Sequence, residues 1–158
     1  MSERIAALRQ RLHESRERLN TIFDQIGDRG EEQIYSEGAQ WTIRQLAIHL
    51  ALADKGHNQM VYHYAEGKEF IPADYDIERY NKRSVEKSDE MTLEQARASL
   101  SQSRSEFLAW LDNLEDESVL DKTGRHATMK ILPISDIIGI MAKHEDGHSA
   151  DLEAMLKA

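Results

Sequence analysis

Four long stretches of this chain repeat apolar residues at steps of three and four, the spacing of a helix that buries one face. The predicted helices run from about residue 2 to 26, from 42 to 66, from 92 to 113 and from 135 to 156. No segment of comparable length alternates apolar and polar residues as a sheet strand does. The pattern therefore predicts an all-α protein built as a four-helix bundle.

The predicted helix starts carry recognisable caps. Thr42 and Thr92 are each followed three residues later by a glutamine, Gln45 and Gln95, which is the capping-box arrangement. Ser135 is the predicted N-cap of the last helix, and Gly27 can close the first helix in a left-handed conformation.

The connection between the second and third helices is the longest one, at residues 68–91. About 24 residues of extended chain reach well beyond the ~30 Å of a long helix, so this connection can cross the whole bundle. The second and third helices can then run parallel. Pro72 and a weakly periodic stretch from Asp74 to Glu90 predict a short helix within the crossover, and residues 127–132 alternate like a short strand.

Length and composition limit the class of protein. With 158 residues the chain predicts one domain spanning residues 1–158, and its formal net charge of −9 argues against nucleic acid or an anionic membrane as partner. The densest apolar run, Leu46 to Ala53, is too short to span a bilayer, and the N-terminus lacks a signal core. We expect a soluble cytoplasmic protein. A homodimer through the bundle faces is compatible with the apolar stripes.

His144 and His148 are the residues with the most chemical meaning. They lie one turn apart on the last helix, on the stripe that Ile137, Met141 and Leu152 mark as the core side. Buried imidazoles need partners, and a divalent metal would satisfy both. The chain has no cysteine, so such a site must be built from histidine and carboxylate ligands.

The second helix offers two candidates for a third ligand, His49 and His57. His57 lies near the centre of the apolar stripe and His49 about 80° to one side of it. Because this helix is apolar nearly all round, the angle does not decide between them. The two lie about 12 Å apart along the helix axis, so one metal cannot take both.

The segments WTIRQLAIHL (residues 41–50) and IMAKHEDGH (residues 140–148) resemble the DinB/YfiT-like family of metal-binding four-helix proteins. The resemblance implies that His49, His144 and His148 bind one divalent ion. Three imidazoles suit Zn²⁺ or Ni²⁺, with iron as a further option. The resemblance also implies small-molecule chemistry with a low-molecular-weight thiol, as an S-transferase or isomerase. The Tyr80–Asn81 step is similar to an aromatic–Asn pair of that family.

Other interpretations of the same residues remain open. His144-Glu145-x-x-His148 also matches the zinc-protease signature, in which Glu145 is the general base; Glu145 is our predicted catalytic residue. Asp54-x-x-His57 and Glu145-x-x-His148 imitate di-iron bundles, with Glu17 and Glu106 as further ligands. The metal could instead be structural in a non-enzymatic, stress-related protein, or the histidines could be hydrogen-bonded without metal.

The other four histidines are not predicted to bind the metal. His13, His63 and His126 are predicted surface or loop residues, and His57 is predicted to be a hydrogen-bonded core histidine rather than a ligand. Asp54, Glu145 and nearby carbonyls are the candidate hydrogen-bond acceptors behind the metal ligands, and the sequence does not choose among them.

Overall fold

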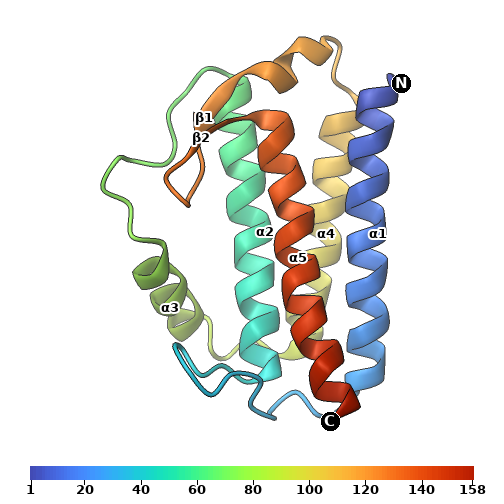
Figure 1. Ribbon diagram of the computed structural model, residues 1–158, viewed down its shortest axis with the longest axis vertical. Coiled ribbons are helices and arrows are strands. Elements are labelled where there is room, and N and C mark those ends of the chain that lie inside the picture. Colours follow the sequence, from blue (N-terminus) through green and yellow to red (C-terminus); the bar gives the residue numbers. More distant parts are fainter.

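A computed structural model describes residues 1–158 (Figure 1). Its α-helices are α1 (Glu3–Ile26), α2 (Ile43–Ala65), α3 (Ile77–Lys87), α4 (Leu93–Asp112) and α5 (Ile134–Lys157). A single 3-10 turn, η1 (Glu117–Asp121), is followed by a small hairpin of β1 (Thr123–Arg125) and β2 (Ile131–Pro133). The strands pair antiparallel, with Gly124 opposite Leu132. The alternating stretch at 127–132 therefore lies mostly in the turn of this hairpin.

The four long helices form a bundle in which α2 and α4 run in one direction and α1 and α5 in the other (Figure 1). α1 packs mainly on α5, and α2 packs on both α4 and α5. The crossover between α2 and α4 contains α3, which lies outside the bundle beside α2. The all-α four-helix bundle with its long crossover is thus confirmed. No helix combines the length and hydropathy needed to cross a membrane.

The helix starts follow the sequence signals at two of three predicted caps. Thr42 and Thr92 both form complete capping boxes with Gln45 and Gln95. The prediction for Ser135 was wrong, because β2 continues directly into α5 at Ile134 and Pro133 precedes the helix without a side-chain cap. The Ser135 hydroxyl accepts a hydrogen bond from Arg4 instead.

Four charged side chains, one from each long helix, divide the apolar interior into two halves. Arg16 of α1, Asp54 of α2, Arg104 of α4 and Glu145 of α5 are all buried. Arg104 Nη2 lies 3.0 Å from an Asp54 oxygen and 2.8 Å from a Glu145 oxygen, and Arg16 also contacts both carboxylates. We call these four residues the ion cluster; its formal charges cancel.

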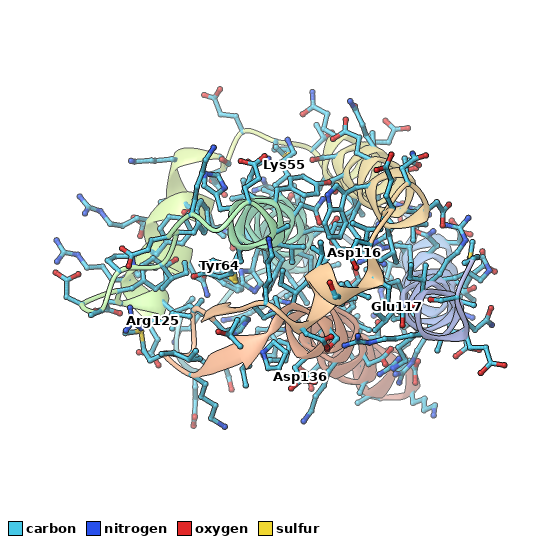
Figure 2. The ribbon with its side chains drawn as sticks, turned by 90° about the horizontal axis from the view of Figure 1, so that it is seen from above. Lys55, Tyr64, Asp116, Glu117, Arg125 and Asp136 are labelled. Carbon is cyan, nitrogen blue, oxygen red and sulfur yellow. The ribbon has the colours of Figure 1, made fainter.

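The hairpin and the crossover are both attached to the end of α2 through Tyr64. The Tyr64 hydroxyl donates to the carbonyl of Arg125 and accepts from the backbone N–H of Ile71. Gly124 lies directly on the Tyr64 ring, where a Cβ would come within 2.3 Å of ring carbons, so only glycine fits. Seen from above (Figure 2), the segment after α4 passes across the end of the bundle from Asp116 towards Arg125.

Candidate metal centre

The packing of α2 against α5 brings His49, His144 and His148 together at one point. The Nε2 atom of His144 lies 3.1 Å from Nε2 of His49 and 3.2 Å from Nε2 of His148. One potential ligand atom from each residue lies within 4.8 Å of the other two. His57 belongs to a different contact, so the structure groups the same three histidines that the family resemblance implies.

The hydroxyl of Tyr35, in the connection between α1 and α2, fixes the orientation of His148. It donates to Asp151 Oδ2 at 2.6 Å, so its oxygen is free to accept from His148 Nδ1 at 2.7 Å. His148 then carries its proton on Nδ1 and has a lone pair on Nε2, the atom that faces the other two imidazoles. Burial raises the pKa of the Tyr35 hydroxyl above its usual range, so this donor stays protonated.

Hydrogen bonds alone do not satisfy the three nitrogens. His144 Nε2 lies between two neighbours, and His148 Nε2 has no proton to donate. If His144 Nε2 carries a proton, it can donate that proton well to only one of the two neighbouring nitrogens. If His144 Nε2 accepts instead, only His49 Nε2 can donate to it. At least one close nitrogen pair therefore lacks a well-placed proton, whereas one cation would bind all three lone pairs.

Two of the three nitrogen separations also fit a divalent ion. Zn–N bonds of about 2.0–2.1 Å in tetrahedral geometry place two ligand nitrogens about 3.3 Å apart. The observed separations of 3.1 Å and 3.2 Å are close to that value. Three imidazoles are a donor set suited to Zn²⁺, Ni²⁺ or iron.

Burial keeps these imidazoles neutral, which is the form that binds metal. Desolvation, together with a smaller effect of nearby histidines, lowers the pKa of His49 to about 3 and that of His144 to about 2. Desolvation also lowers the pKa of His148. Trp41 packs on the His49 ring, with centroids 4.7 Å apart, and shields it from solvent.

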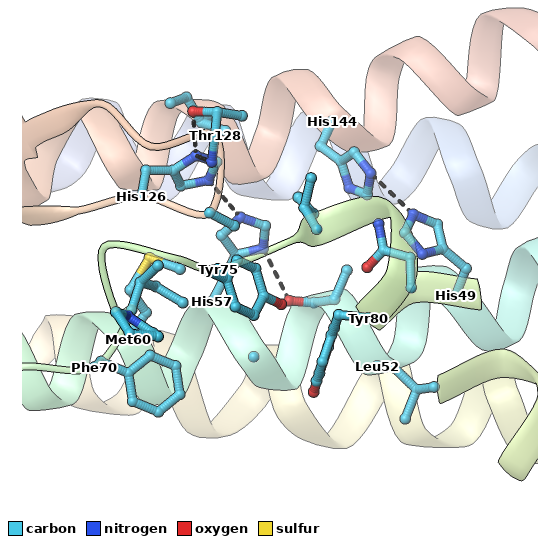
Figure 3. Close-up of a pocket in the computed structure, with 18 residues that line it drawn as sticks. His49, Leu52, His57, Met60, Phe70, Tyr75, Tyr80, His126, Thr128 and His144 are labelled. Carbon is cyan, nitrogen blue, oxygen red and sulfur yellow. Dashed lines mark hydrogen bonds between the residues drawn. The ribbon is translucent and has the colours of Figure 1, made fainter. Parts of the chain in front are cut away.

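A cavity of about 280 Å³ opens beside the three histidines, and His49 and His144 form part of its wall (Figure 3). Its other walls come from α2, from the crossover with the start of α3, from the hairpin turn and from α5. Tyr80 and Asn81, the aromatic–Asn step of the crossover, both line it. A ligand in this cavity would therefore reach the imidazole cluster.

His57 and His126 form a second pair in the cavity wall (Figure 3), with their Nε2 atoms 3.0 Å apart. His57 Nδ1 donates to the Ala53 carbonyl, and the Thr128 backbone N–H donates to His126 Nδ1. His126 Nε2 therefore donates to His57 Nε2. His57 is hydrogen-bonded as predicted. His126 lies in the hairpin loop, which is one of the two predicted alternatives, but it does not lie at the surface. It is 3% exposed, because the hairpin turn folds over the cavity.

Glu145, the predicted catalytic base, is separated from the imidazoles by its orientation. Its carboxylate binds Arg16 and Arg104 in the ion cluster and accepts from Ser15 at 3.0 Å. None of these bonds reaches His49, His144 or His148. One residue along a helix is a rotation of about 100°, which turns Glu145 inward while His144 faces α2 and the cavity.

Two expectations about carboxylates were wrong for related reasons. Asp54 and Glu145 are not acceptors behind the metal ligands, because both bind arginines; the observed acceptor is Tyr35, which sequence patterns did not indicate. The di-iron interpretation also fails. Asp54 and Glu145 are neutralised in the ion cluster, and Glu17 and Glu106 are exposed.

The sequence profile of the DinB superfamily matches residues 6–152, and the chain belongs to this superfamily. Its fold is similar to YfiT from Bacillus subtilis, described as a probable metal-dependent hydrolase with an unusual four-helix bundle topology. That match has 19% identity and a TM-score of 0.77, and covers 99% of this chain and 89% of YfiT.

A second similar structure is the mycothiol-dependent maleylpyruvate isomerase, with 17% identity and a TM-score of 0.70 over 92% of this chain. The chain spans about 60% of the isomerase's length. At such identities the two likenesses show a shared fold. Comparison with curated protein sequences gives no match.

Proposed function

We propose that this protein is a metal-dependent enzyme acting on small molecules, with one divalent ion held by His49, His144 and His148. The observation that carries the proposal is the position of the imidazole cluster in the wall of a cavity. Structural zinc sites are usually closed by four protein ligands, whereas catalytic sites have three and keep one position open. The cluster offers three ligands and faces a space where a small molecule fits.

The reaction class that we propose is transfer of a low-molecular-weight thiol to an electrophile, or isomerisation of a thiol adduct. A bound Zn²⁺, Ni²⁺ or iron ion would act as a Lewis acid that lowers the pKa of a bound thiol towards neutrality. The mycothiol dependence of the isomerase with the same fold supports a thiol cosubstrate. The chain itself has no cysteine to supply one.

The protein's own residues would hold and shield this centre. Tyr35 and Asp151 orient the His148 ring, and Trp41 covers His49. The contacts of Glu145 support a positioning role, because its carboxylate joins α5 to α1 and α4 directly beside His144. A base role for Glu145 stays a prediction that its present contacts do not favour.

Thiol consumption by metal-loaded protein tests the proposal. Protein loaded with Zn²⁺ or Ni²⁺ would be mixed with mycothiol and a chromogenic aryl halide, beside metal-free protein and His148→Ala. We expect acceleration only with metal-loaded wild type. No acceleration with either metal would favour the alternative of a structural metal, in which chelation lowers the melting temperature without affecting any turnover.

Hydrolysis is the second candidate, because YfiT is described as a probable metal-dependent hydrolase. The same open site could activate water on a small ester or amide, and such substrates belong in the assay. A peptidase is disfavoured because the only strands have three residues each and Glu145 is bound to arginines.

We also propose a cytoplasmic location, where low-molecular-weight thiols are kept reduced. The homodimer stays a prediction that sedimentation would test.

A further inference from the structure

The cavity beside the metal centre has no charged residue in its lining. None of its 18 lining residues is Asp, Glu, Lys or Arg, and ten are hydrophobic. Its polar side chains belong to histidine, tyrosine, threonine and asparagine. A binding site built this way offers hydrogen bonds and apolar contact but no counter-ion.

The polar groups of the wall are themselves neutral. His57 and His126 are hydrogen-bonded to each other, with their remaining nitrogens bound to Ala53 and Thr128. Burial lowers the pKa of His126 to about 4 and raises that of the Tyr75 hydroxyl to about 12. Neither group carries a charge near pH 7.

The charges inside the bundle, behind the wall, are already paired. Behind His57 lie Asp54, Arg104 and Glu145, whose charges cancel together with that of Arg16 in the ion cluster. Arg125 of β1 donates to the Ile71 carbonyl at 3.4 Å and is not part of the lining. A charged group deep in the cavity would lose its hydration without gaining an ion pair, which is strongly unfavourable.

We propose that the cavity selects ligands with one metal-binding head group and an uncharged, largely apolar body, and rejects ligands with a second charge on that body. The proposal rests on the proposed function, because the head group needs the metal. It deepens that function by naming the substrate class: a neutral aromatic or branched aliphatic molecule, or its thiol adduct. The discrimination comes from the free-energy cost of burying an unpaired charge. It therefore weakens the binding of charged ligands rather than strengthening the binding of neutral ones.

Two aryl thiols that differ only at the end remote from sulfur test the proposal. 4-Methylbenzenethiol and 4-mercaptobenzoate would be titrated into Co²⁺-substituted protein, following the sulfur-to-cobalt charge-transfer absorption as a measure of binding. We expect 4-methylbenzenethiol to bind at least tenfold more tightly. No absorption change with either thiol would overturn the proposed function together with this inference. Equal affinities, or a preference for the carboxylate, would overturn the inference alone.

A charge placed in the wall should change the preference. Leu52 lines the cavity three residues after His49, so Leu52→Lys places a charge close to the metal centre. Phe70 also lines the cavity and is 37% exposed, so Phe70→Lys is the second variant in case Leu52→Lys does not fold. Either lysine should improve binding of 4-mercaptobenzoate relative to 4-methylbenzenethiol by tenfold or more. Ala98→Lys adds the same charge on an exposed face of α4 and should leave the ratio unchanged. An equal shift in Ala98→Lys, or no shift in a folded cavity variant, would contradict local selection by the wall.

Discussion

The Tyr35 hydroxyl joins a metal-ligand candidate to a carboxylate at the surface. It accepts from His148 at 2.7 Å and donates to Asp151 at 2.6 Å. These two hydrogen bonds determine which nitrogen of His148 carries the proton. They also hold the ring in the orientation in which its Nε2 faces His144. Such outer hydrogen bonds are commonly worth 10–100-fold in metal affinity.

Replacing Tyr35 by phenylalanine should therefore weaken metal binding by about tenfold or more. The phenyl ring keeps the packing but leaves His148 Nδ1 without its acceptor. Competition with a chromogenic chelator would measure the affinity for Zn²⁺. Tyr80→Phe is the matched control, because Tyr80 lines the same cavity and is 52% exposed. Equal affinities in wild type and Tyr35→Phe would refute the orienting role.

At the scale of helices, the ion cluster is the contact that all four members of the bundle share. Arg16, Asp54, Arg104 and Glu145 come from α1, α2, α4 and α5, and Arg104 also donates to the Leu12 carbonyl of α1. Buried charges stabilise a fold only while each has its partner. The cluster therefore fixes how α5 sits against α2, and with it the distance between His144 and His49.

Arg104→Met should destabilise the protein by about 3–5 kcal/mol, because it leaves two buried carboxylates sharing one arginine. Urea unfolding of the metal-free protein would measure the loss. Arg97→Met is the control: Arg97 binds the exposed Asp24, and surface pairs contribute about 0–1 kcal/mol. Similar losses in both variants would mean that the cluster has no special role.

At the scale of the whole molecule, buried neutral histidines make stability depend on pH. Desolvation lowers the pKa of five imidazoles in the folded protein, those of His49, His57, His126, His144 and His148. Near pH 7 both folded and unfolded forms are mostly neutral. As the pH falls below the ordinary value of about 6.5, only the unfolded chain takes up protons.

The free energy of unfolding of metal-free protein should therefore fall between pH 7 and pH 5. Each such histidine contributes up to about 1.4 kcal/mol per pH unit. Urea titrations at several pH values measure this slope, which His126→Gln should reduce. The exposed His13 provides the control, since His13→Gln should leave the slope unchanged. A stability that is constant from pH 7 to pH 5 would contradict neutral buried histidines.

The repeat of apolar residues and the two capping boxes were sufficient to predict the bundle, because both are local signals. The third candidate ligand was not indicated by a local signal. His49 and His57 differ by two turns, and only the packing of α2 on α5 brings His49 to His144. Tyr35 lies in a connection without periodicity, so nothing in the sequence indicated its contact with His148.

The ion cluster did leave a signal that the sequence interpretation missed. Arg16 follows Leu12 by four residues and precedes Leu19 by three, so it occupies a core position of α1. Arg104 stands in the same relation to Leu100 and Phe107. Two arginines on apolar stripes require buried carboxylates, and Glu145 supplies one of them.

Metal content is the measurement that tests the central claim most directly. Elemental analysis would compare untagged wild type with His49→Ala, His144→Ala, His148→Ala and the control His57→Ala, each after equilibration with Zn²⁺. We predict about one ion per chain in wild type and His57→Ala, and loss of the ion in each of the other three. Full occupancy in any of those three variants, or no metal in the wild type, would contradict the site.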